Sequence, residues 1–322
     1  MKNSRKMFIL IEIVLAFMLI LVAAAMLHER GGRQPERIAV ILREPDAGRW
    51  AAFKYGLRAA AEDMGVEVLI VSAEEQPDAA GEETMLKREI VNGADAVILQ
   101  PTSGDIEELL ESIGTKVPVM LTGCPSYGDD KAQIPATGPD NDAMGGALAK
   151  ELLADFGESL DGKTIGIFAE TDGLQELKER ANGFMQAIEG TGAVIEWSAG
   201  AASQEDAKNI LAEQAAVDFV ICLDDSSLVA AGKEAAAGNL HSARVYGIGH
   251  STEAVYYLDM GNVERLVVPD EFNVGYQSLT EVARRLDNRF YRMKNAVISY
   301  TVLYRETLFS RENQELLYTM NQ

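Results

Sequence analysis

The chain of 322 residues contains only two cysteines and three histidines. Two cysteines allow at most one disulfide, which excludes a disulfide-framed miniprotein and a zinc module held by cysteines. Three histidines leave few members for a metal site or a Ser-His-Asp triad, and the sequence has neither a GxSxG elbow nor a GxxxxGK[ST] phosphate loop. We therefore expect no enzyme, no metal and no cofactor.

Basic residues are also scarce, because 29 lysines and arginines stand against 50 aspartates and glutamates, for a formal net charge of −21. The first 37 residues carry six basic and three acidic groups, so the remainder is more acidic still. An acidic body repels phosphate backbones, which excludes DNA and RNA as partners. At roughly 150 residues per domain, the length predicts about two domains.

One long apolar run lies near the N-terminus. Residues 7–27 are apolar apart from Glu12 and follow Lys2, Arg5 and Lys6. A helix of about 20 residues covers roughly 30 Å, the thickness of a bilayer core, and preceding positive charge predicts a body outside the cytoplasm. The length favours an uncleaved anchor, and a signal peptide cleaved after Ala23–Ala25 is the alternative.

After a polar linker, short β-branched runs alternate with segments of helical spacing. Strands are expected at 38–42, 66–71, 96–99 and 117–121 and, beyond a polar stretch at 122–139, at 164–168, 193–198, 219–223, 244–249 and 266–268. Helices are expected between them, at 49–64, 79–92, 105–113, 141–157, 174–190, 204–215, 226–238 and 252–260. This alternation predicts the α/β class with parallel sheets covered on both faces. One sheet of nine strands is possible, but the break at 122–139 favours two doubly wound lobes.

The C-terminal part departs from this alternation. Residues 271–291 have the pattern of one long helix, and residues 297–305 have that of an extended segment. We expect the chain to cross back between the lobes there, through a multi-strand hinge. The expected domains are a signal or anchor helix with its linker at 1–37, lobe 1 at 38–138 plus 271–295, and lobe 2 at 139–268 plus 297–322.

Ligands of open parallel sheets bind beyond the carboxyl ends of the strands, and polar residues follow several of the expected strands. They are Arg43, Asp46, Arg49 and Trp50 after the first strand, Gln100 and Thr102 after the third, and Glu170, Asp224, Asp225 and His250 in the second half of the chain. Carboxylates accept hydrogen bonds and guanidinium donates them in a planar fork, while an aromatic ring suits the C–H face of a sugar. The set favours a hydroxyl-rich solute.

Seven segments, in order, resemble the type I periplasmic solute-binding proteins, the family that includes the ribose- and galactose-binding proteins. They begin with IAVILREPDAGRW at residue 38 and continue with NGADAVILQPTSGD, GPDNDAMGG, KERANGFMQAI, ICLDDSSLVAAG, YGIGHSTEAV and EFNVGYQSL. The resemblance covers nearly all of residues 38–304. It implies a two-lobed binding protein and assigns roles to individual residues.

The resemblance places the candidate ligand contacts as follows. Arg49 and Trp50 fall on a pair of aromatics that stack on a sugar, Asp140 and Asn141 on an Asp-Asn hinge motif, Arg180 on an arginine that grips the sugar, and Asp224 and Asp225 on an Asn-Asp pair. Asp46, Thr102 and His250 complete the set. Gly123-Cys124 and Gly249 stand where the family has Asp-Arg and Asp, and Pro269 stands where it often has Gln, which argues against the usual aldose ligands.

Several of these residues also have a purely structural interpretation. Asp140 and Asp225 could cap the helices that follow them, Trp50 could pack in a core, and Arg180 could belong to a solvated helix face. Cys124 and Cys222 fall in different lobes by the resemblance, so we expect two free, buried thiols.

These observations predict an exported, membrane-tethered binding protein that closes around a small carbohydrate-like ligand. It would deliver the ligand to the permease subunits of an ABC importer. The alternative is a ligand-sensing subunit for a membrane sensor kinase or chemoreceptor. In both cases the lobes close because only the closed form lets the ligand contact both of them.

Overall fold

The computed structural model describes residues 14–20, 35–43, 50–73, 79–101, 117–123, 134–157, 159–171 and 175–320. Within these ranges no helix has the length and apolarity needed to cross a membrane. Residues 14–20 are helical and exposed, and most of the apolar run at 7–27 lies outside the described residues. Residues 37–322 form one compact unit.

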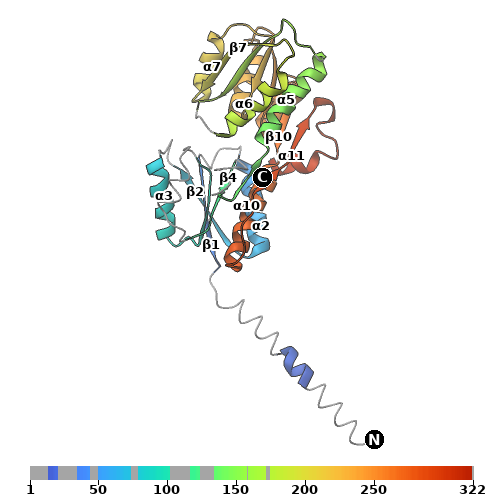
Figure 1. Ribbon diagram of the computed structural model, residues 1–322. Coiled ribbons are helices and arrows are strands. Elements are labelled where there is room, and N and C mark those ends of the chain that lie inside the picture. The colour runs from blue at the N-terminus through green and yellow to red at the C-terminus, as the bar shows by residue number, and fades with distance from the viewer. Residues whose placement is uncertain are drawn as a thin grey trace, which may run out of the picture. The chain divides into compact units, whose positions relative to one another are not determined.

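Lobe 1 is built on a six-stranded sheet in which all neighbouring strands run parallel (Figure 1). Its strand order is β11 (Ala296–Ile298), β5 (Ala136–Pro139), β4 (Val119–Thr122), β3 (Ala96–Leu99), β1 (Arg37–Arg43) and β2 (Glu67–Ala73). Successive residues of a strand point to opposite faces. Ile38, Val40 and Leu42 therefore pack against α2 (Ala51–Met64) and α10 (Glu271–Asp287), while Ala39 and Ile41 pack against α3 (Ala79–Val91).

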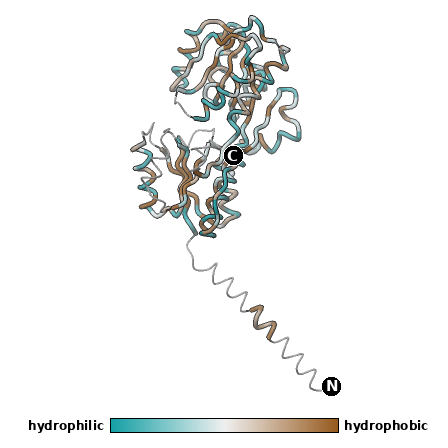
Figure 2. The backbone as a smooth tube through the Cα atoms, viewed as in Figure 1, coloured by the Kyte–Doolittle hydropathy of each residue, from teal (hydrophilic) through white to brown (hydrophobic). Residues whose placement is uncertain are grey.

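Lobe 2 repeats this plan with a second six-stranded sheet. Its order is β12 (Tyr300–Leu303), β10 (Arg265–Pro269), β9 (Arg244–Ile248), β8 (Phe219–Cys222), β6 (Thr164–Glu170) and β7 (Val194–Ala201), with only β12 antiparallel to its neighbour. One face is covered by α5 (Asn141–Phe156) and α6 (Gln175–Ile188), and the other by α7 (Gln204–Glu213), α8 (Asp225–Ala236) and α9 (Thr252–Asp259). Figure 2 shows hydrophobic residues concentrated along the strands, while hydrophilic and hydrophobic residues alternate along the helices.

The chain passes between the lobes three times, between β5 and α5, between β10 and α10, and between β11 and β12. Helix α5 follows β5 of lobe 1 but packs in lobe 2, and helix α10 follows β10 of lobe 2 but packs in lobe 1. Each of these helices therefore lies directly after a crossing. Backbone hydrogen bonds join the crossings, from Asp140 N to Ile298 O at 3.4 Å and from Asp270 N to Ser299 O at 3.2 Å. After β12 the chain continues in lobe 2 through η2 (Arg305–Thr307) and α11 (Gln314–Met320).

The predicted α/β class with two parallel-sheet lobes is confirmed, and the single sheet of nine strands is wrong. No strand was predicted in the polar stretch 122–139, but it contains β5. The sequence of β5, Ala-Thr-Gly-Pro, has little strand propensity, and the strand is buried between β4 and β11. The extended segment at 297–305 divides into β11 and β12, one for each sheet. The helix expected at 105–113 lies outside the described residues, and the proposed lobe boundaries stay a prediction.

Candidate ligand-binding site

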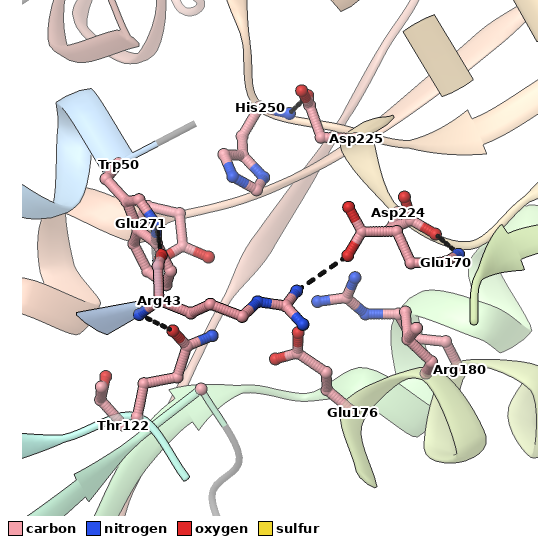
Figure 3. Close-up of a pocket in the computed structure, with 13 residues that line it drawn as sticks. Arg43, Trp50, Thr122, Glu170, Glu176, Arg180, Asp224, Asp225, His250 and Glu271 are labelled. Carbon is pink, nitrogen blue, oxygen red and sulfur yellow. Dashed lines mark hydrogen bonds and ion pairs between the residues drawn. The ribbon is translucent and has the colours of Figure 1, made fainter. Parts of the chain in front are cut away.

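A pocket lies where the carboxyl ends of the strands of both lobes face each other (Figure 3). It encloses about 560 Å³ of empty space, which includes a part open to solvent. It is lined from lobe 1 by Arg43, Trp50, Gln100, Thr122, Gly123 and Glu271, and from lobe 2 by Glu170, Glu176, Leu177, Arg180, Asp224, Asp225 and His250. A cleft in which polar groups from several elements converge is typical of a small-molecule site.

An ion pair joins the two sides of this pocket. Arg43 is the last residue of β1, Glu170 is the last residue of β6, and Arg43 Nη2 lies 2.9 Å from Glu170 Oε2. Both side chains are largely buried, at 9% and 18% exposure. The backbone of Arg43 is held in place as well, because its N–H donates to Gln100 Oε1 at 3.1 Å. The strand end thus directs the guanidinium into the cleft.

Trp50 lies between the end of β1 and α2. Its Nε1 donates to Arg43 O at 3.0 Å, and its ring meets that of Phe53 edge-on at a centroid distance of 5.4 Å. Trp50 is 8% exposed and belongs to the core cluster between the lobe 1 sheet and its helices. It therefore packs in the core and also lines the pocket. Stacking on a ligand stays a prediction.

Arg180 on α6 is 5% exposed, so its interpretation as part of a solvated helix face is wrong. Its Nε donates to Asn141 Oδ1 at 2.9 Å, and its Nη1 donates to Leu223 O at 2.9 Å. Asn141, the first residue of α5, also donates from Nδ2 to Gly123 O of lobe 1 at 3.3 Å. These bonds fix the orientation of the guanidinium, which points toward the centre of the pocket in Figure 3.

Two adjacent aspartates stand between β8 and α8 of lobe 2, where Asp224 is the N-cap of α8 and Asp225 its first residue. Asp224 caps α8, accepting from Ser227 N at 2.8 Å through Oδ1 and from Glu170 N at 2.8 Å through Oδ2. Burial, with the neighbouring Glu170 carboxylate as the next cause, raises the pKa of Asp224 to about 6. Asp225 Oδ1 accepts from the backbone N–H groups of His250, at 2.7 Å, and Ser251, at 2.8 Å.

Gly249 stands beside this aspartate pair for a steric reason. A Cβ atom at this position would lie 3.0 Å from Asp225 Oδ1 and 2.9 Å from Leu228 Cδ2, so a side chain would require its neighbours to move. The departure from the family pattern at Gly249 is therefore part of the local packing. Because position 249 has no side chain, Asp225 Oδ1 has room to accept from the backbone N–H groups of His250 and Ser251.

The remaining predicted residues fall into two groups. Asp140 caps α5 by accepting from Ala143 N at 3.0 Å, and it is not among the residues that line the pocket. Asp46, Arg49, Thr102 and Cys124 lie outside the described residues, so their roles stay predictions. Cys222 is a free, buried cysteine.

The pocket also holds residues that the sequence did not single out as ligand contacts. Glu176 and Glu271 stand in the first turns of α6 and α10, where an acidic residue is common because it interacts favourably with the helix dipole. Because this role explains them without a ligand, Glu176 and Glu271 were not predicted as ligand contacts. Arg43, Gln100 and Glu170 were named in the sequence as polar residues at the ends of strands, but they were not counted among the ligand contacts. Within the described residues, no group of His, Cys, Asp and Glu could hold a metal ion.

Residues 38–289, well over half of the chain, match the model of the periplasmic binding protein domain. A comparison with curated protein sequences gives no match. Among solved structures, a carbohydrate transporter solute-binding protein from Agrobacterium radiobacter in complex with D-arabinose has a TM-score of 0.76 at 19% identity, covering 88% of this chain and 99% of that chain.

Two further structures show the same fold. GanP, a glucose-galactose binding protein from Geobacillus stearothermophilus, has a TM-score of 0.74 at 18% identity and covers 86% of this chain and 100% of its own. A chain of the XylFII-LytSN complex has a TM-score of 0.73 at 16% identity, with coverages of 85% and 99%.

The family match confirms the resemblance found in the sequence. Its members are extracytoplasmic solute-binding proteins and not enzymes. The chain belongs to the family of type I periplasmic binding proteins.

Proposed function

We propose that the protein binds a small carbohydrate in the cleft between its lobes and delivers it to an ABC importer. The observation that carries this proposal is that side chains from both lobes line one pocket, with two guanidiniums, five carboxylates, a hydroxyl and an indole. Guanidinium donors and carboxylate acceptors match the hydroxyl groups of a sugar, and the face of an indole suits its C–H groups. The sugars named for the structurally similar proteins support the same ligand class.

Binding would act on the equilibrium between open and closed lobes. A ligand that contacts Arg43 in lobe 1 and Arg180 in lobe 2 would bind more tightly to the closed form, and it shifts the equilibrium by that difference in affinity. The three crossings form the hinge about which the lobes would move. A downstream protein would then recognise the closed form.

A sensing role is the second candidate. One of the similar structures is a complex between XylFII and a second protein, LytSN, which shows that this fold also occurs in a protein–protein complex. We propose further that the apolar run at residues 7–27 tethers the body to the cell membrane, a location that suits either function. The two functions are distinguished by identifying the protein that co-purifies with the full chain from membranes. A permease would support delivery to an importer, and a sensor protein would support the sensing role.

The ligand proposal is tested by thermal unfolding of the purified full chain against a panel of sugars, polyols and amino acids. A ligand at a hundredfold excess over its Kd stabilises the folded state by about 2.7 kcal/mol, which for a chain of this size raises the Tm by roughly 4–5 °C. We expect at least one carbohydrate to give this shift. If only amino acids do so, the proposed ligand class is wrong.

The role of Arg180 is tested with the carbohydrate so identified. Arg180→Met removes the buried guanidinium, and we expect the Kd to rise at least about tenfold, because an unpaired buried polar group costs on the order of 1–3 kcal/mol. Lys178→Met, an exposed position on the same helix, is the matched control and should leave the Kd unchanged. Arg180→Lys keeps the positive charge but lacks the planar, forked donors of a guanidinium, so this variant should also bind the carbohydrate weakly. Circular dichroism checks that each variant is folded, and wild-type affinity in both Arg180 variants would contradict this role.

A further inference from the structure

A short basic segment lies on the surface of this acidic protein. Residues 284–294, the basic turn, have the sequence RRLDNRFYRMK, with five basic residues and one acidic residue in a chain of net charge −21. Four of the five basic side chains are exposed, and Arg285 is half-buried. Arg284 pairs with Glu281 of α10 at 3.3 Å. Within the described part of the chain, no carboxylate forms an ion pair with any of the other four, which are Arg285, Arg289, Arg292 and Lys294.

Phe290 lies in the middle of the basic turn and is 96% exposed, the largest exposure among the large hydrophobic residues that the structure describes. Its surroundings are nevertheless well fixed. Asn288 accepts from Phe290 N at 3.0 Å through Oδ1 and from Tyr291 N at 2.8 Å through its carbonyl oxygen. Buried Glu281 accepts from the Tyr291 hydroxyl and from Lys294 N, both at 2.8 Å. The turn therefore has a defined shape that presents an aromatic ring and several cations to the outside.

The basic turn lies at the same edge of lobe 1 as the start of β1. All neighbouring strands of the lobe 1 sheet are parallel, and β11 begins at Ala296, just after the turn. The turn thus lies at the edge where β1 begins with Arg37 (Figure 1). Three strands separate β11 from β1, which corresponds to about 19 Å along this edge. The pocket lies at the opposite edge, beyond the carboxyl ends of the strands.

Carboxylates also lie along this edge, but several of them have donors within lobe 1. Glu67 lies 3.8 Å from Arg37 Nε, and Asp95 accepts from Arg37 N at 2.8 Å. Asp63, near the end of α2, accepts from the Tyr276 hydroxyl at 2.7 Å. The exposed cations at positions 289, 292 and 294 have no such ion-pair partner among the described residues, so their charge is available to a partner outside the protein.

The proposed tether brings this edge close to the membrane. Only residues 28–36 lie between the apolar run at 7–27 and β1. A segment of this length spans at most about 30 Å when fully extended. A body tethered through the apolar run therefore keeps the start of β1 within that distance of the bilayer, and the basic turn lies on the same side of lobe 1.

We infer that the basic turn contacts a membrane surface that contains anionic lipids. Phe290 enters the interface, and the cations of the turn bind lipid phosphates. Aromatic rings beside basic side chains bind such surfaces by burying apolar area and by electrostatic attraction. The tether raises the local concentration of lipid at the turn, so that a contact that is weak by itself is occupied. This inference rests on the proposed tether, and it orients the cleft of lobe 1 away from the membrane.

The test follows tryptophan fluorescence in the full chain inserted in lipid nanodiscs. Phe290→Trp places a tryptophan on the basic turn, and Phe309→Trp is the matched control in lobe 2. Phe309 is 67% exposed and follows the end of β12 that pairs with the start of β10, away from the cleft. The nanodiscs contain phosphatidylcholine with brominated acyl chains, a short-range quencher, with or without phosphatidylglycerol. The native Trp50 and Trp197 are common to both variants and give the baseline.

We expect bromine to quench the Phe290→Trp variant at least about twofold more than the Phe309→Trp variant in nanodiscs with phosphatidylglycerol, because only position 290 reaches the interface. The excess quenching should fall when phosphatidylglycerol is omitted. It should also fall when salt is added, because salt screens the attraction between exposed cations and lipid phosphates.

The role of the cations is tested in the Phe290→Trp chain. Adding Arg289→Gln, Arg292→Gln and Lys294→Gln should remove most of the excess quenching, because the attraction to anionic lipid is lost. The matched control removes three exposed cations of lobe 2 and should leave the excess unchanged. Its substitutions are Lys178→Gln, Lys208→Gln and Arg311→Gln.

Two outcomes overturn the inference in different ways. Size-exclusion chromatography in high salt shows whether the full chain stays with the nanodiscs, and a chain that leaves them would contradict the tether on which the inference rests. A chain that stays, with equal quenching at positions 290 and 309 or with quenching that survives loss of the three cations, would contradict the lipid contact itself. The basic turn would then belong to a partner protein, and the tether and the ligand site would be unaffected.

Discussion

The helix pair α5 and α6 of lobe 2 and the pair α10 and α2 of lobe 1 follow the same plan, yet they bring different side chains to the cleft. Each crossing helix is preceded by Pro-Asp, at 139–140 for α5 and at 269–270 for α10, and each aspartate caps its helix. Six residues after each proline stands a glycine, Gly145 or Gly275, that packs against the backbone of the partner helix.

These contacts are reciprocal in both lobes. In lobe 2 a Cβ on Gly145 would lie 1.9 Å from Arg180 O, and one on Gly183 would lie 1.9 Å from Asp142 O. In lobe 1 the corresponding contacts are Gly275 to Phe53 O at 2.2 Å and Gly56 to Phe272 O at 2.0 Å. Arg180 and Phe53 therefore occupy the same place in the two pairs, three residues before the glycine of their helix.

The difference lies in the side chains at these matched places. In lobe 2, Arg180 binds Asn141, the first residue of α5, and points into the pocket. In lobe 1, Phe53 is fully buried in the core, and the first residue of α10 is Glu271, which lines the pocket. The two lobes share their backbone packing, so the chemistry of the cleft depends on a few side chains that differ between them.

The largest expected effect comes from removing the close approach of the helices. In Gly145→Ala the new methyl group would overlap a backbone carbonyl, which cannot move as a side chain can, so α5 and α6 must separate. We expect the free energy of unfolding of the full chain to fall by about 3 kcal/mol, measured by urea unfolding. Gly275→Ala should cost a similar amount in lobe 1, because its Cβ would lie 2.2 Å from Phe53 O.

Gly146→Ala is the matched control for both variants. The nearest atom to a Cβ at this position is Gly183 O at 3.8 Å, which is ordinary contact. Alanine is favoured over glycine in a helix interior by roughly 0.5–1 kcal/mol, so this variant should be as stable as the wild type or slightly more stable. A loss of stability in Gly146→Ala as large as in Gly145→Ala would show that the helix crossing is not the cause.

A second comparison concerns the strand ends. Arg43 of β1 and Glu170 of β6 hold matched positions, and the backbone N–H of each donates to a side chain after the third strand of its sheet. In lobe 1 that acceptor is the neutral Gln100, and in lobe 2 it is Asp224, whose pKa is raised to about 6 by burial and by Glu170. The matched backbone sites therefore differ in their response to pH.

Asp224→Asn should remove this difference. Because the folded-state pKa of Asp224 is raised, the folded protein binds its proton more tightly than the unfolded chain does, and stability falls as pH rises from about 4 to about 6. The shift corresponds to roughly 3 kcal/mol at most. We expect the difference in unfolding free energy between wild type and variant to change by up to this amount between pH 4 and pH 7, in favour of the variant at high pH. Parallel pH profiles for the two proteins would contradict the raised pKa.

The sequence predicted most of the fold because the strands and helices of both lobes have strong local patterns. The buried run Ala96–Leu99 and the amphipathic helix α6 are examples. β5 was missed because its burial depends on the strands on either side of it, which local composition does not reveal.

The candidate site was predicted less completely for a similar reason. Arg180 was found through the resemblance, but its burial against Asn141 depends on how α5 packs on α6. Glu176 and Glu271 could not be separated from acidic residues that only favour a helix N-terminus. That distinction requires knowing which helix ends face the other lobe.

The smallest expected effect tests the two caps at the crossings. Asp140 accepts from Ala143 N at 3.0 Å, and Asp270 accepts from Asn273 N at 3.1 Å and from Asn273 Nδ2 at 2.7 Å. Loss of an N-cap costs about 1 kcal/mol, so Asp140→Ala and Asp270→Ala should each lower the free energy of unfolding by about that amount, with Asp270→Ala the larger. The asparagine variants should recover most of the loss, because asparagine is also a good N-cap. Since neither aspartate lines the pocket, ligand affinity measured by calorimetry should change little. A tenfold loss of affinity in Asp140→Ala without a loss of stability would instead assign Asp140 to ligand binding, and the two crossings would then differ in function as well as in the side chains beside them.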